Sequence, residues 1–123
     1  MKLEEEVKKF MDNKNKGMIT ATAYQMGAKK TAIFPADKAL EYLSLGLVGE
    51  AGEVAEKIKK WIRGDEGISL KENLLHELGD VLWYLANLAF ECGYTLEDVA
   101  EANITKLQNR KKNNTIRGNG DDR

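Results

Sequence analysis

Apolar residues recur at steps of three and four residues along two long stretches of the chain. The first stretch lies between residues 38 and 62 and the second between residues 70 and 92. Such spacing is typical of an α-helix that buries one face. Only a short loop with Gly64 and Gly67 separates the stretches, so the pattern predicts two long helices in an antiparallel hairpin. The recurring positions are Leu40, Leu43, Leu47, Val54, Ile58 and Ile62, then Leu70, Leu74, Leu78, Val81, Leu85 and Leu88.

Shorter helices are predicted on both sides of the hairpin. Residues 2–12 fit a short amphipathic helix, and Thr20 is placed to cap the helix that follows. Asp37, which comes after the single proline, is placed to cap the first long helix. Thr95 and Asp98 resemble a capping box that opens a last helix. The expected fold class is therefore all-α, a helical bundle built on the long hairpin.

We expect three segments along the chain. Residues 1–18 form a peripheral N-terminal extension, residues 19–112 the helical domain, and residues 113–123 a polar C-terminal tail. Three or four helices are too few to cover both faces of a hairpin with two apolar stripes. A homodimer or homotetramer is therefore predicted to complete the bundle.

Composition narrows the class of protein. The chain has 123 residues, 42% of them apolar and 32% charged, with a net charge of −1, which fits one folded domain and argues against a general nucleic-acid binder. A single cysteine, Cys92, forms no internal disulfide. The longest uncharged apolar run, residues 81–90, is too short to span a bilayer, and no export signal is visible. We expect a cytoplasmic protein without a membrane anchor.

Acidic residues interrupt both apolar stripes. Glu50 and Glu77 each fall in the phase of a buried stripe, and each has a second acid three residues on, Glu53 and Asp80. In an antiparallel hairpin Glu53 faces Glu77 and Glu50 faces Asp80. Burying carboxylates costs several kcal/mol unless a cation compensates. The four acids therefore predict an oxygen-rich site for a hard divalent cation, Mg²⁺ or Mn²⁺.

Two further interpretations of the acids stay open. Glu53 with Lys57 and Glu56 with Lys60 have the spacing of helical ion pairs on a solvated face. A di-iron carboxylate site is a third option, but it needs two Glu-x-x-His pairs and His76 is the only histidine.

Glycines also mark this region. Gly46, Gly49, Gly52 and Gly79 lie inside helical patterns, where each costs about 1 kcal/mol relative to alanine. Either tight helix packing or the approach of a backbone, metal or phosphate would account for them.

These residues resemble the all-α nucleoside triphosphate pyrophosphohydrolases of the MazG-like superfamily, and a phage-type branch in particular. The family motif is EExxE followed, after a spacer, by ExxD. Here Gly49-Glu50-Ala51-Gly52-Glu53 precedes Glu77-Leu78-Gly79-Asp80, so Gly49 stands where the motif has its first acid. The likeness extends over roughly residues 20–123 and includes Tyr24-Gln25, Phe34-Pro35 and the N-x-x-K-x-x-x-R element Asn103, Lys106 and Arg110.

The resemblance implies a Mg²⁺-dependent enzyme that converts (d)NTP to (d)NMP and pyrophosphate and clears surplus or damaged nucleotides. It implies Glu50, Glu53, Glu77 and Asp80 as metal ligands, with Glu50 or Glu53 activating the attacking water. Residues for substrate binding follow from the likeness and from their chemistry. Asn103, Lys106 and Arg110 are candidates for the phosphates. Candidates for the base are Tyr84, Trp61 and Tyr24, which could stack on it, and Gln25 or Asn87, which could hydrogen-bond to it.

Because Gly49 replaces a motif acid, a second class of function stays open, a non-catalytic helical module that binds nucleotide or a partner. The chain has no Gly-x-x-x-x-Gly-Lys-Ser/Thr loop, so a P-loop is excluded.

Overall fold

The computed structural model describes residues 5, 8, 19–65 and 69–120. Within the two long ranges the elements are α2 (Ala21–Lys30), the 3-10 turn η1 (Ala36–Lys38), α3 (Ala39–Arg63), α4 (Leu70–Glu91) and α5 (Leu96–Lys112). The all-α prediction and the antiparallel hairpin of α3 and α4 are confirmed. Most of the helix predicted over residues 2–12 and the last three residues of the tail lie outside the described residues.

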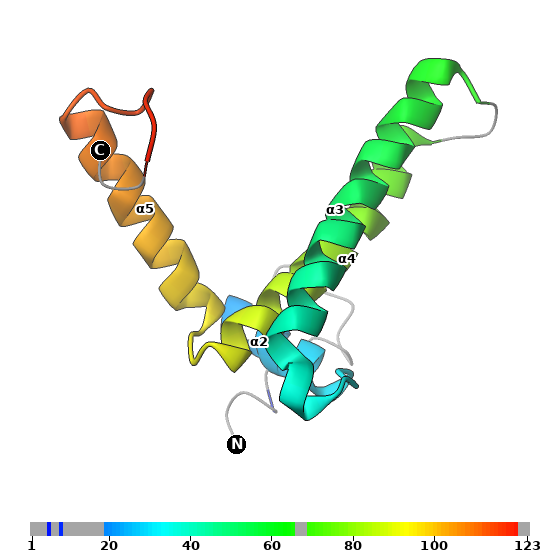
Figure 1. Cartoon of the computed structure of the whole chain (residues 1–123), viewed down its shortest axis with the longest axis horizontal. Coiled ribbons are helices and arrows are strands. Elements are labelled where there is room, and N and C mark those ends of the chain that lie inside the picture. The colour runs from blue at the N-terminus through cyan, green and yellow to red at the C-terminus, as the bar shows by residue number, and fades with distance from the viewer. Residues whose placement is uncertain (1–4, 6–7, 9–18, 66–68, 121–123) are drawn as a thin grey trace.

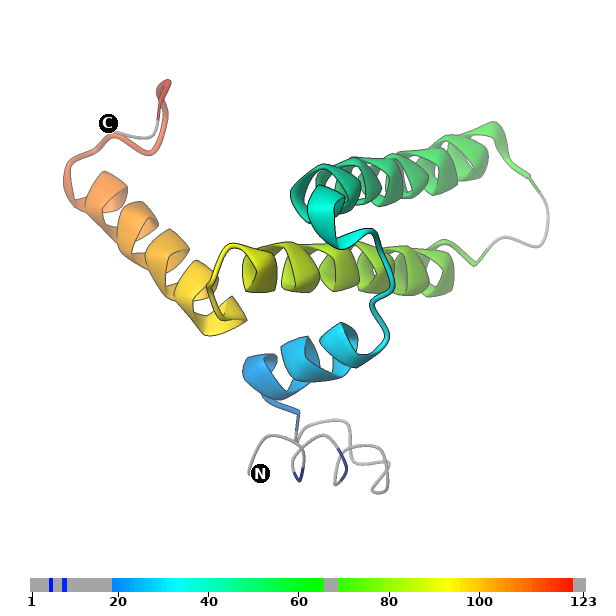
Figure 2. The same ribbon diagram turned by 60° about the horizontal axis from the view of Figure 1, so that its bottom comes forward.

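Helix α4 is the centre of the arrangement. It packs against α3 along the hairpin and against α2 on another side (Figure 2). In the described part of the chain, α5 contacts α2 and α4 but not α3. Figure 1 shows the result, in which the hairpin and α5 diverge as two arms from a base that contains α2. None of the described helices has the length and apolar character needed to cross a membrane.

Local sequence signals explain most helix ends. Thr20 caps α2 as predicted, because its side chain accepts a hydrogen bond from the Ala23 amide at 3.1 Å. Gly64 ends α3 in the left-handed conformation, with φ at +81°, which a residue with a side chain rarely adopts. The predicted capping box at Thr95 and Asp98 is present with both of its hydrogen bonds.

The prediction that Asp37 caps the first long helix is wrong. The chain after Pro35 makes a 3-10 turn, with the Lys38 amide bonded to the Pro35 carbonyl at 3.0 Å. Asp37 lies inside this turn, and Lys38 occupies the N-cap position of α3 without a side-chain cap.

Small residues form a buried cluster where α2 meets α4. Alanines from both helices are buried there, and Leu96 from the start of α5 packs on them: Ala28, Ala86, Ala89 and Leu96. Gln25 lies in the same contact with 2% of its surface exposed. Its amide nitrogen donates to the carbonyls of Ala86 and Tyr94, and its amide oxygen accepts from the Leu96 amide. This single side chain therefore ties α2 to the α4–α5 turn.

The predicted apolar stripes are only partly buried in one chain. Leu43 on α3 is fully buried, but Leu40, Ile62 and Leu78 are exposed. Further apolar side chains lie open on the same two helices: Leu45, Val48, Leu75 and Leu82. Within residues 19–65 and 69–120, α3 contacts only α4 and η1, so no further described helix packs on α3 to cover its exposed apolar side chains.

Candidate metal centre and nucleotide site

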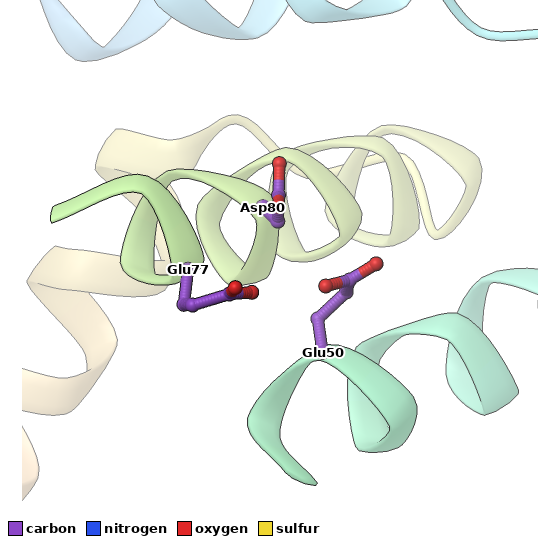
Figure 3. Close-up of side chains that lie close together, drawn as sticks. All are labelled: Glu50, Glu77 and Asp80. Carbon is purple, nitrogen blue, oxygen red and sulfur yellow. The ribbon is translucent and has the colours of Figure 1, made fainter. Parts of the chain in front are cut away.

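Three carboxylates meet between the two helices of the hairpin. Glu50 comes from α3, and Glu77 and Asp80 come from successive turns of α4. One oxygen of each lies within 4.8 Å of the others. Figure 3 shows Glu77 and Glu50 extending toward each other from the two helices, with Asp80 on the next turn of α4. Glu50 and Glu77 are half-buried, whereas Asp80 is exposed. The structure therefore brings these three acids together between α3 and α4.

Glu53 lies outside this group. It is exposed on α3, one turn beyond Glu50, although it is close enough for its charge to act on Glu50. The two acids are three residues apart, so their side chains leave the helix in directions that differ by about 60°. The structure therefore brings together three of the four predicted ligands, and the role of Glu53 stays a prediction.

The cluster imposes an electrostatic cost on Glu50. Partial desolvation raises the pKa of the Glu50 carboxyl above its usual value, and the negative charges of Asp80, Glu77 and Glu53 raise it further. A divalent cation among these oxygens would reverse the repulsion.

The donor set fits a hard cation. Three single oxygens from carboxylates are the ligands that Mg²⁺ and Mn²⁺ prefer. These three residues would hold the cation, and water or phosphate oxygens would supply its other ligands.

Two tyrosines border the acids. Tyr84 follows Asp80 by one turn, and burial, Tyr42, Glu50 and Asp80 together raise the pKa of its hydroxyl. Partial burial and the charge of Asp80 likewise raise the pKa of Tyr24 on α2. Both hydroxyls are therefore neutral hydrogen-bond donors at physiological pH. Tyr84 and Tyr24 are the predicted base-binding residues that lie near the acids.

Glycines near the site have different surroundings. A Cβ atom at Gly46 would collide with the ring of Tyr84, so this glycine makes room for the tyrosine. At Gly49, Gly52 and Gly79 a Cβ would meet nothing within 4 Å. Tight helix packing therefore accounts for Gly46, and the other three glycines face open space in the described chain.

The ion-pair partner of Lys57 differs from the one that the sequence predicts. Its ammonium lies 3.7 Å from an oxygen of Glu77 on the other helix, and not on Glu53 as the spacing along α3 indicated. Likewise Glu56 pairs with Lys59 at 2.9 Å, in place of the predicted Lys60. Lys57 follows Glu50 by seven residues, or two helical turns. This spacing indicates that both side chains lie on one face of α3.

The remaining predicted binding residues lie apart from the acids. Gln25 uses its amide in the hydrogen bonds between α2 and the α4–α5 turn. Trp61 is about half exposed in the last turns of α3. On α5, Asn103 is exposed and Lys106 half-buried, and both line a concave surface next to the α4–α5 turn. Arg110 is buried, and it donates to the Gly120 carbonyl at 3.3 Å. Their roles toward a nucleotide stay predictions.

Comparison with known proteins agrees with this geometry. The family model described as the MazG nucleotide pyrophosphohydrolase domain matches residues 38–115, which include the hairpin, the acids and all of α5. The chain belongs to the MazG nucleotide pyrophosphohydrolase family. It is similar to the Gene 37 protein of Mycobacterium phage L5, with 45% identity over 109 residues that cover 81% of this chain and 96% of that protein. No solved structure gives a significant match.

Proposed function

We propose that this MazG-family chain is a Mg²⁺-dependent nucleoside triphosphate pyrophosphohydrolase that converts (d)NTP to (d)NMP and pyrophosphate. The observation that carries the proposal is the meeting of Glu50, Glu77 and Asp80 between α3 and α4, in the segment that the family model matches. Nucleotide-pool cleaning in the cytoplasm is the role we assign to it.

The carboxylates would divide the work. Glu50, Glu77 and Asp80 would hold the divalent cation, which supplies charge neutralisation for the phosphates. Glu53 lies next to this group but outside it, so it is the acid best placed to orient the water and accept its proton. The water oxygen bonds to the α-phosphorus as the bond to the bridging oxygen breaks, and pyrophosphate leaves. The hydroxyls of Tyr84 and Tyr24 would donate hydrogen bonds to the substrate beside Asp80.

Pyrophosphate release tests the reaction. The purified chain with Mg²⁺ should release pyrophosphate from at least one member of a panel of canonical and modified nucleoside triphosphates. Asp80→Asn should lower the rate by roughly 100-fold or more and weaken metal binding. Glu53→Gln should lower the rate as strongly while Mn²⁺ still binds. Glu41→Gln serves as the control, because Glu41 is an exposed acid in the first turn of α3.

Outcomes against the proposal are equally clear. An absence of pyrophosphate release from the whole panel, or rates unchanged by Asp80→Asn, would contradict the enzyme. Gly49 in place of a motif acid favours a second candidate, a module that binds nucleotide without cleaving it. Calorimetry that records Mg²⁺-dependent nucleotide binding without turnover would support that module.

A further inference from the structure

Lys57 is a cation at the edge of the acidic cluster. Its ammonium lies 3.7 Å from a Glu77 oxygen, and the side chains of the pair are only 28% and 15% exposed. The contact crosses from α3 to α4, and Glu77 is itself part of the candidate metal centre. Among the ion pairs described for residues 19–65 and 69–120, this is the one that joins a basic side chain to the cluster.

Stability alone does not account for this placement. A half-buried Lys–Glu pair contributes little net stability, because desolvation offsets much of the attraction. Lys59, two residues further along α3, pairs with Glu56 of its own helix and is mostly exposed. Lys57 differs from it in pairing across to α4 with an acid of the cluster, and in being mostly buried.

The proposed reaction requires a cation from the protein at this point. A nucleoside triphosphate carries about four negative charges, and one Mg²⁺ cancels two of them. The chain surrounds the binding position with carboxylates, which repel the phosphates further. The basic residues of α5 lie on a helix that does not contact α3 in the described chain. Lys57 stands beside the cluster and carries a flexible four-carbon stem that can redirect its ammonium.

We propose that Lys57 binds an oxygen of the substrate's phosphate chain and that Glu77 holds its ammonium until then. The inference rests on the proposed function and adds a phosphate-binding residue to it. A divalent cation bound to the Glu77 carboxylate would offset its negative charge, so the attraction of Glu77 for the Lys57 ammonium would weaken. The Lys57 ammonium then exchanges a carboxylate partner for a phosphate oxygen within reach of its stem, so cation and triphosphate bind cooperatively.

Calorimetry on the whole chain separates phosphate binding from metal binding. The variants are Lys57→Met, Lys57→Arg and, as the matched control, Lys59→Met. The probes are α,β-methylene analogues of the four dNTPs with Mg²⁺, the corresponding dNMPs, and Mn²⁺ alone. Lys57→Met should weaken binding of the triphosphate analogue about tenfold, the scale of a charged hydrogen bond. Binding of dNMP should change less than twofold, and Mn²⁺ should bind at least as tightly. Lys57→Arg should restore most of the affinity, and Lys59→Met should change none of these values.

Three results would overturn the inference alone. One is triphosphate binding that Lys57→Met leaves unchanged. Another is Mn²⁺ binding that weakens in step with triphosphate binding, since Lys57 would then only position Glu77. The third is an equal loss in Lys59→Met, which would indicate a general charge effect. If the unaltered chain binds no analogue in the presence of Mg²⁺, the proposed function fails and this inference fails with it.

Discussion

Gly46 and Tyr84 form a close contact that fixes a side chain of the candidate site. The glycine on α3 leaves the space that the tyrosine ring fills, and the ring also meets Trp83 edge-on with centroids 4.9 Å apart. Its hydroxyl end lies near Glu50 and Asp80. The position of Tyr84 beside the acids therefore depends on the absence of a side chain at residue 46.

Replacing Gly46 with alanine should displace Tyr84. Overpacking of this kind costs about 1–3 kcal/mol, and the better helix propensity of alanine returns about 1 kcal/mol. We expect Gly46→Ala to lower the free energy of unfolding by about 1 kcal/mol, as measured by urea denaturation. The matched variant is Gly49→Ala, on the same helix with nothing within 4 Å, which should raise it by about 0.5–1 kcal/mol. Equal effects of the two substitutions would contradict this account of Gly46.

At the scale of elements, α5 is joined to α2 through Glu97. The Thr22 amide donates a 2.8 Å hydrogen bond to one oxygen of Glu97, and the Thr22 hydroxyl donates to the other. Thr22 lies in the first turn of α2, where unpaired amides favour a negative charge. The hydrogen bonds from Thr22 lower the pKa of the Glu97 carboxyl below its usual value.

The depressed pKa gives this contact a defined pH dependence. A carboxyl with a lower pKa in the folded state stabilises the fold above its unfolded-state pKa, and that stability is lost as pH falls through the folded-state value. Glu97→Gln should therefore lower the free energy of unfolding by about 1 kcal/mol at pH 7, a value kept small because Glu97 is exposed and Thr22 is only half-buried. The difference from the unaltered chain should close below about pH 4. A difference that persists unchanged at pH 3 would rule out the carboxylate as its source.

The sequence predicts the ends of the helices better than it predicts the contacts in the candidate site. Thr20, Gly64 and the Thr95–Asp98 box act within one turn of the chain, so their patterns suffice. The prediction for Asp37 as a helix cap is wrong because a 3-10 turn begins after Pro35, and Asp37 lies inside that turn.

Contacts between helices depend on more than spacing. The positions of Glu50, Glu77 and Asp80 follow from helical phase and the antiparallel hairpin. The partner of Lys57 depends on how side chains cross from α3 to α4, which periodicity does not specify. Gln25 illustrates the same limit, because its three partners are backbone groups of distant turns.

At the scale of the whole molecule, the described helices leave much of their surface open, and Figure 1 shows α5 diverging from the hairpin. Six exposed apolar side chains lie on α3 and α4, and we call the surface that they form the open side of the hairpin: Leu45, Val48, Ile62, Leu75, Leu78 and Leu82. These features support the predicted homodimer or homotetramer, in which a second copy covers this side.

A charge placed on the open side of the hairpin tests this assembly. Leu78 is 55% exposed on α4 and sits among other exposed leucines, so Leu78→Glu should oppose burial against another copy. Light scattering after gel filtration should give a multiple of 13.8 kDa for the unaltered chain and a mass near 13.8 kDa for the variant. Ile33→Glu is the control, because Ile33 is 89% exposed but lies outside the hairpin, and its mass should match the unaltered chain. An unaltered chain that stays monomeric at high concentration, or a Leu78→Glu variant that keeps the full assembly mass, would show that this side of the hairpin is not the interface.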